Sequence, residues 1–214
     1  MPIHEADNKE AINAREQYCN LMEEIKRRIR VISDLLASKH QLDSRTVEEF
    51  CYLQLRMIAE LIAISCLVAH QDIKEKEFHN LKKRWQADDI ISGLDKLHTG
   101  FYPRPMVEDR FKNGMHNIAN FEGEYLRKEE IKILYDKCGE ILHIGNINGL
   151  SRNWTRTIDL NKIIEWQRKI VNLLNMHHIN LVHEDYEILV MMNTEGMGGA
   201  VSCYVLKAVI PLPG

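Results

Sequence analysis

The first regular pattern along the chain is an apolar stripe in the N-terminal region. Between residues 9 and 38, apolar side chains recur every three or four positions, which predicts one long amphipathic helix. The members of the stripe are Tyr18, Leu21, Met22, Ile25, Ile29, Ile32, Leu35 and Leu36. Basic side chains occupy other positions of the same segment, at Lys26, Arg27, Arg28 and Arg30. For these four we favour a solvated helix face over a phosphate-binding patch, because charge runs on helices usually serve solubility.

The next segment, residues 47–70, is apolar on nearly every face of a helix. A helix of this kind is expected at the buried centre of a bundle. Its predicted start is a capping box, in which Thr46 accepts from the amide of Glu49 and the Glu49 carboxylate accepts from the amide of Thr46. Arg56 and Glu60 are charged exceptions one turn apart, and we expect them to pair with each other or with a neighbouring polar group.

The remaining periodicity predicts further helices and several short strands. Residues 74–98 form a helical stretch with a break near Asp88 or Asp89, and the glycine and two prolines that follow end it. Asn113 and Gly114 are a strong signal for a two-residue turn between two strands. The other predicted elements are helices over about 126–143 and 159–177, and strands over 178–183, 186–193 and 200–209.

Together these elements predict a mainly α fold. We expect an antiparallel bundle of about five helices with a β-hairpin insertion and a small C-terminal antiparallel β-sheet. Residues 1–177 would form the bundle, with the hairpin as an excursion over 104–122. Residues 178–214 would form a small β appendage packed on that bundle.

Composition narrows the class of protein. The chain has 214 residues and a net charge of −3, so no global basic field favours nucleic acid or an anionic membrane. Its five cysteines are scattered and show no C-x-x-C pair, which argues against a disulfide framework or a structural zinc site. The N-terminus lacks the pattern of a secretion signal, and the most apolar run, 57–69, is shorter than a bilayer span. We therefore expect a cytoplasmic protein with no membrane partner.

The sequence contains none of the common nucleotide-binding, metalloprotease or hydrolase motifs. The most suggestive segment places Lys137, Glu140, His143 and Asn146 at the end of one predicted helix. Glu140 and His143 share a helix face, and a histidine with a carboxylate partner can act as a general base. Alternatively, the segment is an ordinary helix end, in which His143 interacts with the terminal carbonyls and Gly145 supplies a left-handed cap. On the segment alone we favour the helix end.

The segments Gln54–Ile62 and Tyr135–His143 together resemble an uncharacterised bacterial family and, more distantly, HEPN domains. HEPN domains are compact helical bundles common in toxin–antitoxin, abortive-infection and antiphage systems. Their ribonuclease members act without metal and carry an Arg-x4-6-His motif at a dimer cleft. In this sequence Lys137 replaces the arginine, and a lysine offers a point charge instead of a planar fork. The only literal match, Arg110 to His116, straddles the predicted turn and is set aside.

The resemblance implies a HEPN-like protein of a bacterial defence or toxin–antitoxin system that binds RNA or a protein partner. It also implies a homodimer without a metal or other cofactor. If the protein is catalytic, we expect metal-independent RNA cleavage. In that case His143 would be the base and Lys137 the phosphate contact, with Glu140 and Asn146 as orienting groups and Arg56 and Glu60 as a supporting shell. The alternative is a non-enzymatic interaction or regulatory module whose C-terminal strands pair with a partner by their edge.

The neighbouring histidines and the tryptophans are expected to have structural roles. His177 and His178 are predicted at the end of a helix, where neighbours point about 100° apart, so a shared metal ion is disfavoured. The three tryptophans show no interleaved basic pattern. We expect Trp166 in the core, and for Trp154 we favour a loop anchor over a base-stacking role.

Overall fold

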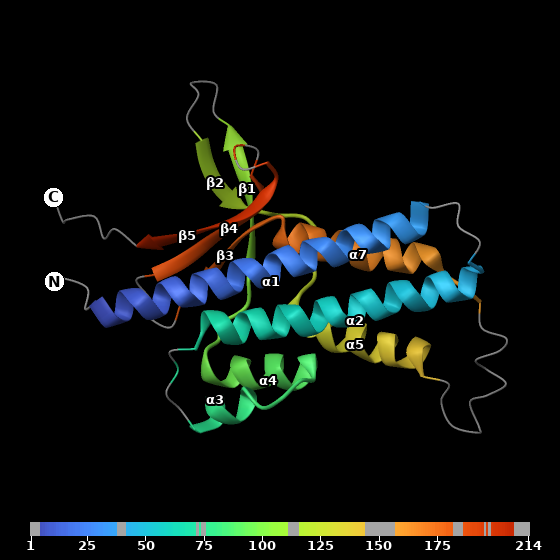
Figure 1. Ribbon diagram of the computed structural model, residues 1–214, viewed down its shortest axis with the longest axis horizontal. Helices are drawn as coiled ribbons and strands as arrows, with labels where there is room; N and C mark the ends of the chain where they lie inside the picture. Colours follow the sequence, from blue (N-terminus) through green and yellow to red (C-terminus); the bar gives the residue numbers. More distant parts are fainter. Residues whose placement is uncertain are drawn as a thin grey trace.

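The computed structural model describes residues 5–37, 42–71, 73, 76–110, 116–143, 157–181, 186–194, 196 and 198–207. The described helices are α1 (Glu5–Ala37), α2 (Ser44–Ala69), α3 (Lys76–Leu81), α4 (Ala87–Leu97), α5 (Lys128–Leu142) and α7 (Leu160–Leu174). The described strands are β1 (Arg104–Arg110), β2 (His116–Asn120), β3 (Met176–Asn180), β4 (Tyr186–Thr194) and β5 (Ala200–Lys207). The predicted fold class is confirmed, because a helical bundle carries one antiparallel sheet (Figure 1).

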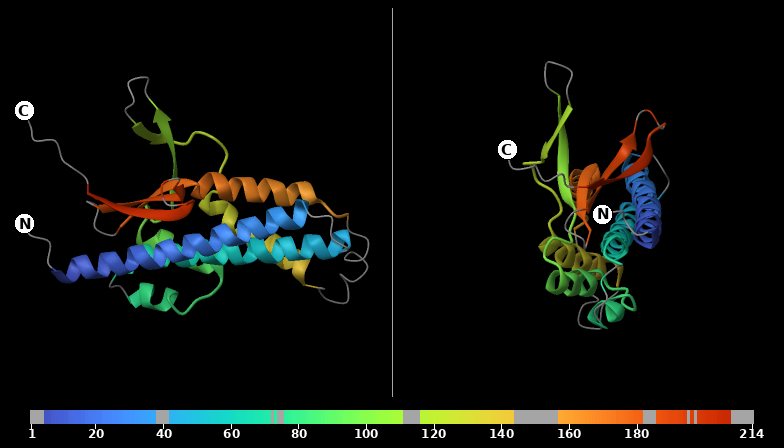
Figure 2. Two further views of the ribbon diagram at one scale, coloured as in Figure 1. Left: turned by 45° about the horizontal axis from the view of Figure 1, so that its top comes forward. Right: turned by 90° about the vertical axis from the view of Figure 1, so that its left-hand side faces the viewer.

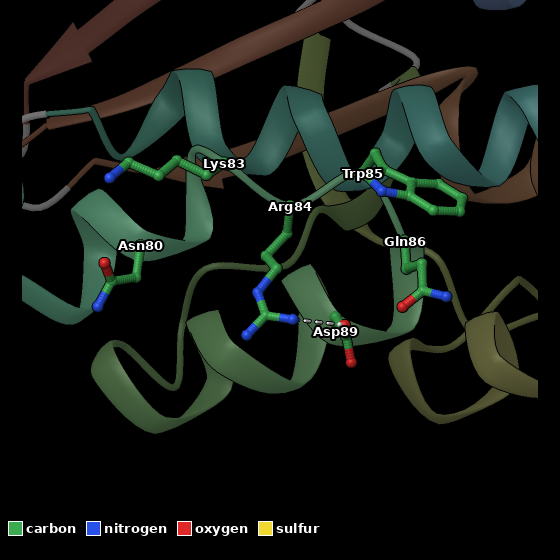
Figure 3. Close-up of a pocket in the computed structure, with 6 residues that line it drawn as sticks. All are labelled: Asn80, Lys83, Arg84, Trp85, Gln86 and Asp89. Carbon is green, nitrogen blue, oxygen red and sulfur yellow. Dashed lines mark hydrogen bonds and ion pairs between the residues drawn. The ribbon is translucent and has the colours of Figure 1, made fainter.

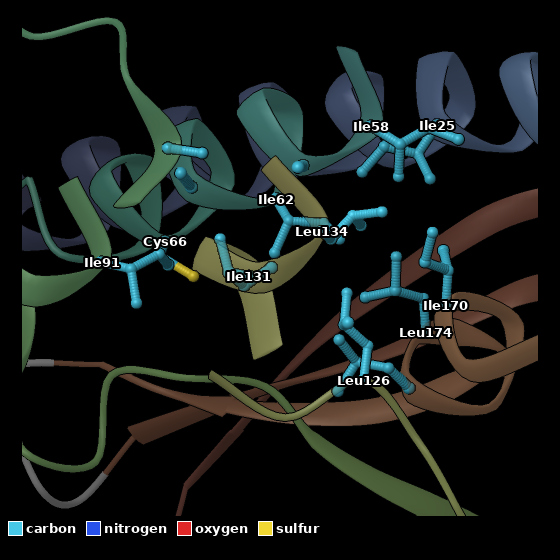
Figure 4. Packing of buried hydrophobic residues seen from close by; sticks show 14 of the residues in the cluster. Ile25, Ile58, Ile62, Cys66, Ile91, Leu126, Ile131, Leu134, Ile170 and Leu174 are labelled. Carbon is cyan, nitrogen blue, oxygen red and sulfur yellow. The ribbon is translucent and has the colours of Figure 1, made fainter. Parts of the chain in front are cut away.

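Helix α2 is the centre of the bundle. Helices α1, α4, α5 and α7 all contact it, and its buried side chains include Cys51, Leu55, Ile58 and Ile62. Figure 4 shows Ile58 beside Ile25 of α1, and Ile62 near Leu134 of α5. Burial of apolar side chains from several helices in one cluster is the main stabilising term of such a fold.

The start of α2 differs from the predicted capping box. The cap is Asp43, whose Oδ1 accepts from the amides of Arg45 and Thr46 at 3.0 Å and 3.1 Å. Thr46 lies inside the first turn, and its hydroxyl donates to the other Asp43 carboxylate oxygen at 2.7 Å. An aspartate three residues earlier therefore satisfies the free amides, so the helix begins at Ser44.

By length and composition alone, α2 could cross a membrane. More than half of its apolar window (56%) is buried inside the protein, and the core helix of a bundle meets the same criteria. This is weak support for a membrane span. The cytoplasmic location stays a prediction.

Helix α1 covers the predicted segment, but not all of its basic residues lie on a solvated face. Lys26 is buried, and its Nζ donates to the carbonyl oxygens of Met192, at 2.9 Å, and Gly199. Arg27 and Arg28 each pair with Glu24 at 2.7 Å. Only Arg27 lies on a solvated face as predicted, because the Arg28 side chain is 12% exposed and also donates to Gln54 of α2. The prediction was wrong for Lys26 because the end of β4 and the start of β5 pack against α1 at that position.

The sheet has the strand order β2-β1-β3-β4-β5, and every neighbouring pair is antiparallel. The predicted hairpin is confirmed, with Met106 of β1 opposite Asn120 of β2. Strand β1 also pairs with β3, through Arg104 opposite His178. The hairpin and the C-terminal strands therefore form one sheet, in which β3, β4 and β5 lie beside the helices and the β1–β2 hairpin projects away from them (Figure 2).

The start of α4 and the end of α7 differ slightly from the predicted positions. The break in the segment 74–98 is confirmed, and α4 begins at Ala87, just before the expected aspartates. The last helix ends at Leu174 instead of His177, because β3 already begins at Met176. In that strand His177 and Ile179 point into the core and alternate with less buried neighbours, so a two-residue period replaces the helical one.

Candidate functional site

The predicted site lies on the second half of α5. The Lys137 Nζ and Glu140 Oε2 atoms form an ion pair of 2.9 Å on an exposed surface. His143 is exposed at the C-cap of α5, and its backbone N–H donates to the Gly139 carbonyl at 3.1 Å. Asn146 lies outside the described residues. The structure thus brings Lys137 and Glu140 together, in an exposed pair that contributes little to stability.

The two charged residues of α2 meet α5 through a tyrosine. Arg56 Nε lies 3.3 Å from Glu60 Oε1, and Arg56 Nη2 donates to the Tyr135 hydroxyl at 2.9 Å. That hydroxyl donates in turn to Glu60 Oε1 at 3.1 Å. The guanidinium also lies over the Tyr135 ring, 4.6 Å from its centroid. Burial, followed by the charge of Glu60, raises the pKa of Tyr135, which keeps the hydroxyl protonated as a donor.

This closed triangle of Arg56, Glu60 and Tyr135 satisfies its own members. Across the described part of the chain, Arg56 and Glu60 make no hydrogen bond or ion pair with Lys137, Glu140 or His143. The triangle therefore joins α2 to α5 as a polar cross-link between two apolar surfaces, where unpaired charges would be costly.

The neighbouring histidines His177 and His178 lie on a strand, so they point to opposite faces of the sheet. His177 is buried, with Nδ1 donating to the Leu174 carbonyl at 2.9 Å and Nε2 accepting from the Tyr18 hydroxyl at 2.9 Å. His178 Nδ1 lies 2.8 Å from Glu187 Oε2. Among the described residues, no three His, Cys, Asp or Glu side chains are grouped as metal ligands would be.

Buried thiols offer no activated nucleophile. Burial raises the pKa of Cys51 to about 11 and that of Cys138 to about 12. A thiol with so high a pKa holds very little thiolate near neutral pH, and the thiolate is the reactive form.

A surface pocket that the motif search missed lies where α3 passes into α4. It has a volume of about 470 Å³. The lining residues are Asn80, Lys83, Arg84, Trp85, Gln86 and Asp89. Figure 3 shows Arg84 between Lys83 on one side and Trp85 on the other. Three basic residues, Lys82, Lys83 and Arg84, directly precede Trp85, although they form a run and not an interleaved basic pattern.

The polar groups of this pocket are largely uncommitted. Trp85 is 65% exposed, which is unusual for the largest apolar side chain. Arg84 makes a long ion pair of 3.5 Å with Asp89, and both side chains remain well exposed. Within the described residues, the side chains of Lys83 and Gln86 have no hydrogen-bonding or ionic partner. Lys83 and Trp85 extend to opposite sides of Arg84 (Figure 3), and a pocket lined by an aromatic ring and two cations can bind a ligand that combines a planar group with negative charge.

A second hollow, between α4 and α5, is less suited to a ligand. Its cations are already neutralised, because Lys128 Nζ lies 2.6 Å from an Asp95 carboxylate oxygen and Lys132 Nζ lies 3.7 Å from one of Asp88. An incoming anion would have to compete with these carboxylates.

No known protein family, no curated protein and no solved structure matches this chain. Function must therefore be inferred from the geometry of the sites.

Proposed function

We propose that this protein binds single-stranded RNA through the pocket between α3 and α4, with Trp85 as the stacking platform. The observation that carries the proposal is the exposed indole of Trp85 in a pocket that is also lined by the cations of Lys83 and Arg84. Base–aromatic stacking contributes about 1–3 kcal/mol per base and tolerates any base. Nearby cations bind the phosphates that link one nucleotide to the next.

The chemistry of the lining supports a short segment of RNA as the ligand. The pocket volume of about 470 Å³ accommodates a nucleotide. The Gln86 amide also lines the pocket and can donate to or accept from a base edge or a ribose 2′-hydroxyl. The net charge of −3 limits the contact to a few phosphates, so we expect moderate affinity and a shallow salt dependence.

The resemblance to HEPN domains supports RNA over DNA and a bacterial defence or toxin–antitoxin setting. Under this proposal the bundle holds RNA at the α3–α4 pocket. Cleavage, where it occurs, would use His143 as the base and Lys137 as the phosphate contact, without metal.

Binding is tested by fluorescence anisotropy with a labelled single-stranded RNA and the variants Trp85→Ala and Ile133→Ala. Ile133 is the matched control, because it is 59% exposed but lies on α5. We expect Trp85→Ala to weaken binding by about 5- to 150-fold, the equivalent of one lost stacked base, and Ile133→Ala to leave it unchanged. Each of Lys83→Ala and Arg84→Ala should lower the salt slope by about one.

Two results would contradict the proposal. Equal affinity of the Trp85→Ala variant and the unaltered protein would show that RNA binds elsewhere or not at all. Equal binding of single-stranded DNA with the same sequence would remove the preference for RNA.

Cleavage is tested separately by incubating RNA in EDTA with the unaltered protein and with His143→Ala. Loss of cleavage in the variant is the expected result for a metal-independent nuclease. Equal cleavage by both proteins, or none by either, would refute the catalytic part while leaving the binding part intact.

A further inference from the structure

Polar contacts hold helix α1 against β5, the strand at one edge of the described sheet. Lys26 Nζ donates to the carbonyl of Gly199, just before β5, and Glu23 Oε1 accepts from the Val201 amide at 2.6 Å. Cys19 Sγ donates to the Val201 carbonyl at 3.4 Å. Positions earlier in the helix therefore meet positions later in the strand, and β5 runs antiparallel to α1 (Figure 1 and Figure 2).

This register brings Cys203 to the level of Cys19. The Glu23 carboxylate lies at Val201. Cys19 is four residues earlier in the helix, a rise of about 6 Å, and Cys203 is two residues later in the strand, about 6–7 Å further along. Side chains two apart in a strand share one face. Because Val201 is buried in the core beside α1, the Cys203 thiol faces α1 as well.

The electrostatic surroundings of Cys203 agree with contact between the two thiols. Burial raises the pKa of Cys203, and a hydrogen bond with the Cys19 thiol raises it further. The charge of Arg15, one turn before Cys19, acts in the opposite direction and favours a thiolate. Because the thiolate is the reactive form, Cys203 is poorly suited to react first, which leaves Cys19 as the attacking thiol.

The pair also differs from the other cysteines in its access to solvent. Cys51, Cys66 and Cys138 are buried, whereas Cys19 and Cys203 are partly exposed. Among the five cysteines, the two that a small oxidant can reach are therefore the two that lie together. Redox-sensing cysteines are typically accessible and placed next to a second cysteine that resolves the oxidised one.

We propose that Cys19 and Cys203 are a redox modification site, at which a peroxide drives formation of a reversible disulfide between α1 and β5. The Cys19 thiolate attacks one oxygen of hydrogen peroxide and the O–O bond breaks, which gives a sulfenic acid and a hydroxide that takes up the thiol proton as water. The Cys203 sulfur then attacks the sulfenic sulfur, the S–O bond breaks, and a second water leaves with the Cys203 proton. Two thiols are oxidised to one disulfide, and one peroxide is reduced to two waters.

The disulfide would fix a strand end that is otherwise lightly covered. Directly after Cys203, the side chains of Tyr204, Val205 and Leu206 are 45%, 38% and 38% exposed. Oxidation would hold this end of β5 against α1, and a dithiol reductant would release it by thiol–disulfide exchange. Disulfides in reducing compartments are usually transient and redox-sensing, which suits a reversible pair better than a permanent one.

The site is tested by treating the unaltered protein with one equivalent of hydrogen peroxide, followed by alkylation in urea and peptide mass spectrometry. We expect a linked pair of peptides that contain Cys19 and Cys203, and a fall in free thiols from five to three. Dithiothreitol should restore all five. The melting temperature should rise by about 5–15 °C on oxidation, because the bond closes a loop of more than 180 residues. Protein oxidised in urea is the control and should show mixed pairing.

Two variants test the order of the steps. In Cys203→Ser, Cys19 should stop at the sulfenic acid and be trapped by dimedone. In Cys19→Ser, labelling of Cys203 should be at least about tenfold slower. Cys51→Ala, at a buried cysteine, is the matched control and should still form the disulfide. Circular dichroism checks that each variant remains folded.

Three results would contradict the inference. Five free thiols after peroxide treatment, or a disulfide between another pair of cysteines or between two molecules, would overturn the site. Equal dimedone labelling of Cys203→Ser and Cys19→Ser would overturn the assignment of Cys19 as the attacking thiol. This inference does not depend on RNA binding at Trp85.

Discussion

Two wholly buried histidines should make the folded protein sensitive to mild acid. His70 donates from Nδ1 to the Cys66 carbonyl at 2.8 Å, and its ring lies 5.0 Å from that of His98, centroid to centroid. His177 is held between the Leu174 carbonyl and the Tyr18 hydroxyl. Burial, which disfavours the charged imidazolium, lowers the pKa of each from 6.5 to about 4.

The direction in which the free energy of unfolding changes with pH follows from proton binding. Between pH 6.5 and 4 the unfolded chain binds more protons at these two histidines than the folded protein does. The free energy of unfolding is therefore highest above pH 6.5 and falls as the pH drops through this window. Lowering a pKa from 6.5 to about 4 corresponds to about 3 kcal/mol per histidine, with a slope of at most about 1.4 kcal/mol per pH unit for each.

The measurement is urea unfolding, followed by circular dichroism at a series of pH values from 7.5 down to 5. The variants are His70→Asn and His177→Asn, because the asparagine amide retains a donor near the Nδ1 position but does not titrate. His79→Asn, at an exposed position of α3, is the matched control. In His70→Asn and in His177→Asn, the slope of the free energy of unfolding against pH should fall by about half of the part that the two histidines contribute together. This holds whatever the stability of each variant at pH 7.5.

The effects of glutamates with lowered pKa values fall below the pH range of this measurement. Glu24, Glu130 and Glu165 have pKa values lowered from 4.5, so their contributions are lost only as the pH falls below that value. The same pH slope in the unaltered protein, His70→Asn and His177→Asn would refute the reasoning, since protonation of these histidines would then not be linked to unfolding.

Three further substitutions test individual contacts by urea unfolding. Tyr135→Phe removes the hydroxyl that joins α5 to the ion pair of α2, and should lower the free energy of unfolding by about 1–2 kcal/mol. An unchanged free energy of unfolding would show that water replaces the hydroxyl. Lys26→Met strands the carbonyl oxygens of Met192 in β4 and of Gly199 just before β5, and should cost about 1–3 kcal/mol. Arg27→Met at the surface should cost under about 0.5 kcal/mol, and equal effects of the two substitutions would contradict the burial of Lys26. Asp43→Ala removes the N-cap of α2 and should lower the free energy of unfolding by about 1 kcal/mol, more than Thr46→Ala does. A larger effect of Thr46→Ala would favour the capping box of Thr46 and Glu49.

Much of the helical framework was predictable, because periodicity reports which face of an element is buried. The stripe from Tyr18 to Leu36 predicted α1, and the nearly uniform apolarity of 47–70 predicted that α2 is the buried centre. The Asn113-Gly114 pair predicted the β1–β2 hairpin. These are local signals, since each depends on residues a few positions apart.

Only the tertiary structure decided the roles that depend on distant partners. Lys26 is buried because strand β4 and the turn before β5, more than 160 residues later, supply its acceptors. Tyr135 became the partner of Arg56 across 79 residues, and His177 entered a strand because Tyr18 and the neighbouring strands surround it. The basic residues before Trp85 can be read from the sequence, but the exposure of its indole depends on how α3 and α4 pack. Periodicity identifies a buried face, but the element that covers it is set by long-range packing.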